Sequence, residues 1–291
     1  MQFLVYYLAA LGLSAMVGHA FRVKRAGSAL NYVAFVLIYF IGNWAGSQVR
    51  STASVLGVFV SAFEIFLPSV VVAYALAFAV EVALGKRTSG PKRGRAKRSK
   101  VPYFFLLAVS LGWISGAFFP IPRVEDVVYS FLIVLSVVVG LDMGGTVDME
   151  SLKRQARNLW LPVCAMAGAV IGGGISALLF GFSVRFAVAS SLGMGWYSLT
   201  GPVVSSYMGP RYGAIAFFAN FIREQATFLL VPLVGGDAGE SILTLGASTT
   251  MDDTLSLYMS ALGDENKLII FFNGFIISLL IPFLVPLALT I

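Results

Sequence analysis

Charged residues are scarce in this sequence, and that scarcity decides its broad class. Only 12% of the 291 residues are charged, whereas 58% are hydrophobic. A soluble domain carries roughly 25% charged residues, so a large soluble core is excluded. Apolar runs of about 18 residues or more, long enough for membrane helices, recur from one end of the chain to the other. We therefore expect an all-α polytopic membrane protein embedded in a lipid bilayer.

Residues that commonly carry chemistry are nearly absent as well. The single cysteine, Cys164, excludes an intrachain disulfide, and with only one histidine no His/Cys cluster suggests a metal site. No Walker-type phosphate loop is present, so ATP is not expected to be an energy source for this chain. A serine protease needs a base near its nucleophile, and His19 lies far in sequence from Ser198. No cofactor is therefore expected.

Ten hydrophobic segments organise the chain. They lie at residues 2–21, 29–47, 52–84, 101–119, 124–142, 158–182, 186–208, 214–233, 241–262 and 268–291. The third is longer than the roughly 20 residues of one crossing and contains Glu64 and Pro68, so a tilt, kink or break is expected there. Residues 86–100 hold eight Lys and Arg residues among Gly, Pro and Ser, which is typical of a solvated linker. This basic cytoplasmic linker separates an N-terminal membrane bundle, 1–85, from a C-terminal bundle, 101–291, that we expect to carry most of the substrate site.

The distribution of basic residues predicts the orientation. If the N-terminus is outside and all ten segments cross, sixteen Lys and Arg residues face the cytoplasm and three face outward. This asymmetry predicts a multi-pass protein of the plasma membrane with both termini outside. Because the basic residues report topology, no nucleic-acid partner is expected. Segments 186–208 and 241–262 could span or re-enter, which leaves eight to ten crossings open.

Two segments carry residues that a continuous membrane helix does not need. In the first these are Gly193, Gly195, Trp196, Tyr197, Ser198, Thr200 and Gly201; in the second, residues 246–254 include Ser248 and Thr249. Irregular backbone survives in hydrocarbon only where it lines a cavity or is buried in protein. Discontinuous helices of this kind expose backbone groups to substrates in secondary transporters. The sequence therefore predicts a substrate site between two discontinuous or re-entrant segments.

Ionisable residues inside the hydrophobic segments are candidates for binding or coupling, since each costs about 2.5 kcal/mol or more at mid-bilayer unless paired or hydrated. They are Glu64, Asp142, Arg223, Glu224, Asp252 and Asp253, and Asn220 lies beside them. Arg223 and Glu224 are about 100° apart on a helix and are poor partners for each other. The alternative for Arg223 is a buried ion pair with Asp252 or Asp253. Asp253 also fits a helix cap and Asp142 a membrane boundary.

A possible internal repeat appears in the first half. Residues 37–43 and 135–141 both end a span at a glycine, before a polar turn and another apolar span. Each half of the chain would then be led by such a pair of spans.

Several of these motifs together resemble the LysO family of lysine exporters. They are residues 193–201 (GMGWYSLTG), 216–220 with Arg223-Glu224, 246–252 with Thr254-Leu255, and 274–282, and the resemblance covers residues 129–291. It implies export of L-lysine and its analogues from the cytoplasm, driven by exchange with H⁺ or another cation. It also implies that Glu224, in the Arg-Glu motif, acts in transport. Family members can carry a further acid after the second span, where this chain has Ser47, Gln48 and Val49. Glu64 or Asp142 could take its place.

A pocket between the two interrupted segments is expected both from the residues and from the resemblance. Glu224 and Asp252 would bind the ammonium groups of lysine, and Trp196 or Tyr197 would contact its aliphatic stem or make a cation–π contact. One alternative is export of another small organic ion. A further alternative is an intramembrane aspartyl enzyme using Asp142 and Asp252, although residues 140–142 do not read Gly-x-Gly-Asp. Whether the chain forms a homo-oligomer is left open.

Overall fold

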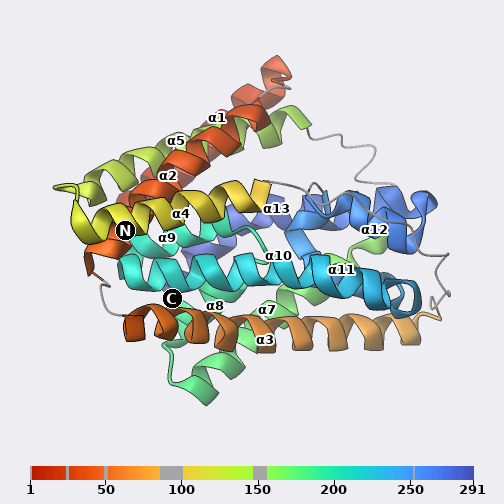
Figure 1. Cartoon of the computed structure of the whole chain (residues 1–291). Helices are drawn as coiled ribbons and strands as arrows, with labels where there is room; N and C mark the ends of the chain where they lie inside the picture. Colours follow the sequence, from red (N-terminus) through yellow and green to blue (C-terminus); the bar gives the residue numbers. More distant parts are fainter. Residues whose placement is uncertain (1, 24–25, 49–51, 86–100, 147–155, 252) are drawn as a thin grey trace.

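The structure is a computed structural model that describes residues 2–23, 26–48, 52–85, 101–146, 156–251 and 253–291 (Figure 1). Every regular element in those ranges is a helix. Four helices there are long and apolar enough to cross a membrane: Val55–Ala83, Ala156–Phe180, Pro210–Val234 and Lys267–Thr290. Three shorter apolar helices accompany them, at Val5–Phe21, Tyr32–Ser47 and Leu107–Phe118. The predicted helical membrane class is therefore confirmed, while the count of ten segments stays a prediction.

Four helices of the N-terminal half form one unit, consisting of α1 (Gln2–Phe21), α2 (Ala26–Gln48), α4 (Val101–Phe118) and α5 (Val124–Thr146). Glycines let α2 pack closely on α4 and α5 pack closely on α1, as helices in membranes commonly do. A Cβ at Gly42 would lie 2.5 Å from the Val109 oxygen, and a Cβ at Gly140 would lie 2.4 Å from the Leu11 oxygen. Corresponding residues of the two contacts are 98 positions apart: Gly42 corresponds to Gly140 (140 − 42) and Leu11 to Val109 (109 − 11). This is also the spacing of the repeat predicted from residues 37 and 135. The pair α1–α2 and the pair α4–α5 therefore pack equivalently.

Helix α3 (Thr52–Ala83) is continuous, so the break considered at Pro68 does not occur. It packs on α7 (Trp160–Phe180), which comes after the short helix η1 (Ala156–Asn158). A Cβ at Gly172 would lie 2.4 Å from Ser69 Cα, so glycine at this position lets the two helices pack closely. The ring of Phe59 contacts that of Phe218 in α10 (Pro210–Ala238), at 4.3 Å between centroids. At its other end α3 reaches the end of α10, where the Glu81 carboxylate accepts a hydrogen bond from Glu240 N, so α3 and α10 run parallel.

The predicted broken segment at 186–208 consists of α8 (Val184–Ser191) and α9 (Tyr197–Met208), which we call hairpin 1. Helix α8 folds back along α7, where a Cβ at Gly173 would lie 2.8 Å from Val188 Cα. Helix α9 folds back along α10, since only Gly209 separates them and Gly213 meets Ser205. The C-terminal end of α7 and the N-terminal end of α10 therefore flank the two arms of hairpin 1.

A second interrupted segment comes after α10 at the opposite end of the bundle. It comprises η2 (Glu240–Ile242), α11 (Leu243–Gly246), η3 (Ala247–Met251) and α12 (Leu255–Leu262), and we call residues 240–262 hairpin 2. Its two arms lie side by side, because the Tyr258 hydroxyl donates to the Ile242 oxygen and accepts from Gly246 N. The short helix η4 (Asp264–Asn266) then leads into α13 (Lys267–Thr290), which packs on both hairpins. The apolar core extends from α2 and α5 through α9 and α10 to α13.

Candidate functional site

The tips of the two hairpins meet inside the bundle. Ser248 N–H and its hydroxyl both donate to the Met194 oxygen, at 3.1 and 2.8 Å. Met194 and Ala247 hold φ angles of 43° and 48°, a left-handed conformation that costs a non-glycine residue on the order of 1–3 kcal/mol. Such strain persists only where the surroundings fix it, and it gathers at ligand-binding sites. The meeting point of the tips is therefore the candidate functional site.

Asn220 of α10 fixes the tip of hairpin 1. Its Oδ1 accepts from Gly195 N at 2.8 Å and its Nδ2 donates to the Ser190 oxygen at 2.9 Å. A Cβ at Gly193 would lie 2.3 Å from Thr200 Oγ1, and Thr200 in turn donates to the Trp196 oxygen. Gly195 has φ 98°, which favours glycine. The predicted glycines and hydroxyl groups thus shape the tip, and Asn220 holds it.

The aromatic residues of hairpin 1 have different surroundings. Tyr197 is buried and makes edge contacts with Phe217 and Phe221 of α10, at 5.3 and 5.7 Å between ring centroids. Trp196 is only half-buried. Ser198 is buried beside them, and Gly201 lets α9 approach Phe217. Of the two aromatic residues predicted to contact substrate, Trp196 is partly exposed, whereas Tyr197 packs against α10.

Glu224 and Arg223 are both buried in α10, with 0% and 2% of their surfaces exposed. Glu224 lies one helical turn after Asn220 and therefore on the same face of α10, the face that holds the tip of hairpin 1. Arg223 serves the other hairpin: its Nε donates to the Leu245 oxygen at 2.9 Å and its Nη2 to the Thr244 oxygen. The described contacts of Arg223 thus go to backbone oxygens at the end of α11. Asp252, one of its two predicted partners, lies outside the described residues.

The tip of hairpin 2 is tied together by its own hydroxyl groups. Thr249 Oγ1 donates to the Gly246 oxygen and lies 3.0 Å from Thr254 Oγ1, while Thr250 Oγ1 donates to the Ala247 oxygen. Together with the Ser248 contacts to hairpin 1, these bonds satisfy the irregular backbone that hydrocarbon would penalise. The hydroxyl groups of Ser248 and Thr249 therefore bond the backbone of both tips.

Three buried polar atoms at the tips have no hydrogen-bond partner in the part of the chain that the structure describes. They are the hydroxyl oxygens of Ser190 and Ser191, at the end of α8, and Oδ1 of Asn273 on α13. A buried polar atom without a partner costs about 1–3 kcal/mol, and ordered water or a ligand removes that cost. The tips therefore have unfilled capacity to bind a polar ligand.

Glu64 and Asp142 lie on other elements. Glu64 is half-buried on α3. The Phe59–Phe218 and Glu81–Glu240 contacts both join positions 159 apart (218 − 59 and 240 − 81). Because α3 and α10 run parallel, the same spacing places Glu64 at the height of Arg223 along the bundle (64 + 159). Asp142 is half-buried on α5, within the four-helix unit. An aspartyl enzyme would need Asp142 beside Asp252, whose position is not described.

Glu81 anchors the base of hairpin 2, a role that the sequence did not predict. Its side chain is 1% exposed, and its two oxygens accept from Glu240 N at 2.8 Å and Ser241 N at 3.0 Å. Gly239 has φ 71°, and a Cβ there would lie 2.2 Å from Glu81 Oε1. No local signal pointed to this contact, because the partners are separated by 159 residues.

Replacing Glu81 by glutamine is expected to loosen the base of hairpin 2. The amide keeps one acceptor oxygen and turns an NH₂ group toward a backbone N–H, so one of the two bonds is lost, at a cost of about 1–3 kcal/mol. Hydrogen exchange at residues 239–246 should accelerate about tenfold or more relative to the unmodified protein. Glu265→Gln, at an exposed carboxylate, is the matched control and should leave that exchange unchanged. Equal exchange rates in all three proteins would contradict the anchoring role.

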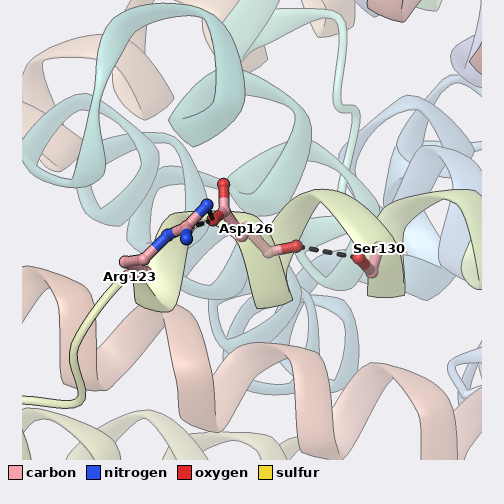
Figure 2. Close-up of polar contacts among 3 residues, drawn as sticks. All are labelled: Arg123, Asp126 and Ser130. Atoms are coloured by element: carbon pink, nitrogen blue, oxygen red, sulfur yellow. Dashed lines mark hydrogen bonds and ion pairs between the residues drawn. The ribbon is translucent and has the colours of Figure 1, made fainter.

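An exposed ion pair lies at the start of α5, outside the two hairpins. Arg123 and Asp126, at the start of α5, form an ion pair at 2.7 Å with side chains 85% and 55% exposed (Figure 2). Ser130 in the same view donates to the backbone oxygen of Asp126. An exposed pair of this kind contributes about 0–1 kcal/mol. Asp126 is therefore a suitable position at which to remove a carboxylate as a control.

Comparison with known proteins agrees with the resemblance that the motifs indicate. The family model of the lysine exporter LysO matches residues 106–289, which is more than half of the chain. The chain is 30% identical over 155 residues to the lysine exporter LysO of Escherichia coli (strain K12), covering 53% of this chain and 52% of that protein. It is 26% identical over 179 residues to a putative lysine exporter of Haemophilus influenzae, covering 62% of this chain and 91% of that protein. The match thus spans about half the length of the first relative, and no solved structure matches the chain. The chain belongs to the LysO family of lysine exporters.

Proposed function

We propose that this protein is a secondary active transporter that exports L-lysine, and lysine analogues, from the cytoplasm in exchange for H⁺ or another cation. The observation that carries the proposal is the meeting of two hairpin tips, one of which is bonded to Asn220, one helical turn before Glu224, a carboxylate with no exposed surface. A buried carboxylate at interrupted backbone suits the recognition of a cationic amino acid. The family to which the chain belongs supports lysine as the substrate.

The proposed topology has eight crossing helices and two re-entrant hairpins, which enter from opposite faces of the membrane. Both termini lie at the end of the bundle where α3 begins, and residues 86–100 come after the opposite end of α3 (Figure 1). With hairpin 1 re-entrant, Arg211 moves to the outer side, which then holds Arg50, Arg123, Arg185 and Arg211. Apart from these four residues and the buried Arg223, the remaining fifteen of the 20 Lys and Arg residues lie on the inner side. This split still supports termini outside and a plasma-membrane location.

In the proposed mechanism the substrate lies at the tips. Its ammonium groups are neutralised by Glu224 and by Asp252, the latter from its position in the sequence alone. Its carboxylate faces the start of α9, where the helix dipole is positive, and its aliphatic stem contacts Trp196. If Glu224 binds either a proton or the cationic substrate, but never both, each lysine that leaves is exchanged for a proton. The hairpins then open alternately to the two sides.

Efflux from proteoliposomes tests the proposal directly. Vesicles that contain the purified protein and radiolabelled L-lysine should release the label faster than protein-free vesicles when the outside is acidified. Collapsing the pH gradient with a protonophore should slow the release, and the same series with Na⁺ gradients identifies another coupling cation. Release equal to that of protein-free vesicles under every gradient would refute the proposal. Competition by arginine, ornithine and small carboxylates separates lysine from another small organic ion as substrate.

A further inference from the structure

The two hairpins belong to a structural repeat of 53 residues, formed by α8–α10 and α11–α13. Met194 and Ala247, the two non-glycine residues with left-handed φ angles at the tips, are 53 positions apart (247 − 194). Asn220 and Asn273 are also 53 apart (273 − 220), and each donates from Nδ2 to a carbonyl 30 residues upstream, on Ser190 and Leu243 respectively. Each asparagine therefore holds the first arm of its own hairpin in the same way.

The second hydrogen bond of the asparagine differs between the two repeats. Asn220 Oδ1 accepts from Gly195 N. The residue equivalent to Gly195 in the second repeat is Ser248 (195 + 53), and its N–H donates instead to the Met194 oxygen of hairpin 1. Asn273 Oδ1 is consequently left without a partner in the described part of the chain, although the side chain has 0% of its surface exposed. The Ser248–Met194 contact between the tips therefore uses the N–H group that would otherwise be equivalent to the donor of Gly195, and it leaves Asn273 Oδ1 without a donor.

The orientation of the Asn273 amide is fixed by its surroundings. Nδ2 faces three oxygens, those of Leu243 and Ala247 at 3.4 and 3.3 Å and Thr250 Oγ1 at 3.2 Å. The Thr250 hydroxyl already donates to the Ala247 oxygen, so it can only accept from Asn273. Turning the amide over would set Oδ1 against three acceptors. The vacant atom is thus an acceptor oxygen, and it needs either a donor or a cation.

Oxygen atoms gather around the Asn273 amide, and oxygen-rich surroundings suit a cation. Its Nδ2 contacts the Leu243 and Ala247 oxygens at the C-terminal end of α11. Gly274, the next residue, lies against the tip itself, where a Cβ would be 2.7 Å from the Ser248 oxygen. Arg223 also contacts α11, where it donates to the Thr244 and Leu245 oxygens. These two oxygens lie on a different side of α11 from the Leu243 and Ala247 oxygens that Asn273 contacts.

We infer that Oδ1 of Asn273 is a ligand for a cation at the tip of hairpin 2, which is either Na⁺ or an ammonium group of the substrate. The inference deepens the proposed transport function and rests on it for the ammonium ligand. It assigns the two asparagines different tasks. Asn220 uses both of its polar atoms on the backbone of hairpin 1, whereas Asn273 uses one on hairpin 2 and keeps the other for a ligand.

Ligand-dependent thermal stability of the purified protein tests this assignment. The melting midpoint is measured during titration with NaCl against choline chloride at constant ionic strength, and with L-lysine in choline chloride. Asn273→Ala should raise the half-saturating concentration of at least one of the two ligands about tenfold or more, which corresponds to about 1.4 kcal/mol. Asn43→Ala removes a buried asparagine of α2 that bonds Ser115 and Ile121 N, away from both hairpins. It is the matched control, and it should lower the melting midpoint without ligand but leave both half-saturating concentrations near those of the unmodified protein.

The two arms of the experiment separate the sources of the cation. A loss confined to NaCl assigns the oxygen to Na⁺, and a loss confined to lysine assigns it to an ammonium group. Unchanged half-saturation for both ligands overturns the inference. If Asn273→Ala does not fold, cryo-EM maps of the unmodified protein in NaCl and in lysine decide: ligand density at Oδ1 supports the inference, and water alone in both maps overturns it. Lysine efflux measured in parallel shows whether the proposed function fails separately.

Discussion

Replacing Glu224 by glutamine is expected to abolish lysine efflux while the protein stays folded. Glutamine has nearly the same volume, so the packing of α10 is kept, but the amide can neither neutralise an ammonium group nor carry a proton. Loss of the charge partner of a buried ligand costs about 3 kcal/mol or more, so efflux should fall at least about 100-fold. The measurement is release of radiolabelled lysine from proteoliposomes across a pH gradient. Any residual efflux should no longer respond to that gradient.

Two controls accompany this variant. Asp126→Asn removes a carboxylate from the exposed pair with Arg123 and should transport like the unmodified protein (Figure 2). Glu224→Asp keeps the charge but withdraws it by one methylene, so proton-dependent efflux should persist at a reduced rate. Efflux by Glu224→Gln that equals the unmodified rate and still depends on the pH gradient would show that another group couples transport.

The sequence contains signals for irregular backbone in two segments, but it contains none for the direction of the helices on either side of them. Glycine and hydroxyl residues in hydrocarbon marked residues 193–201 and 246–254 as irregular, and both lie at or beside the tips. Whether such a segment spans or returns depends on the turn at its C-terminal end. Here a single residue, Gly209 with φ 94°, turns the chain so that α10 runs back along α9. Glycine permits that turn without requiring it, so the sequence alone left both outcomes open.

Partners distant in sequence were the other part that could not be predicted. Opposite charges suggested an ion pair between Arg223 and Asp252 or Asp253, which stays a prediction because Asp252 lies outside the described residues. The described partners of Arg223 are carbonyl oxygens, which every residue carries. For Asn273 the sequence does contain a signal. Residues 217–222 (FFANFI) and 271–276 (FFNGFI) are similar, and the run LVPL occurs at both 230–233 and 284–287. These matches lie 54 residues apart, one more than the 53 between Asn220 and Asn273, so they indicate a second copy but align Asn220 with Gly274. Each copy nevertheless contains an asparagine, shifted by one position.

Replacing Arg223 by leucine is expected to collapse hairpin 2 and to abolish transport with it. Leucine leaves the Thr244 and Leu245 oxygens buried without these donors, and each such acceptor costs about 1–3 kcal/mol. A loss of about 3 kcal/mol should lower the melting midpoint of the ligand-free protein by roughly 6–12 °C. Arg223→Lys should fall between the two, because a single ammonium cannot reproduce the fork that reaches both oxygens. Arg211→Gln, at an exposed position in the first turn of the same helix, should melt like the unmodified protein.

The same variants distinguish positioning from substrate binding by Arg223. If the guanidinium bound the carboxylate of lysine, its removal would leave the ligand-free melting midpoint unchanged. It would also erase discrimination against cadaverine, which is lysine without that carboxylate. If Arg223 positions hairpin 2, the midpoint falls before any ligand is added, and hydrogen exchange rises at residues 243–251. The two fixed donations to α11 favour the second outcome, since a guanidinium committed to two backbone oxygens has fewer donors to offer a substrate. In that outcome Glu224 supplies the negative charge that binds the ligand. Arg223, the preceding residue, holds hairpin 2 in the position that ligand binding requires.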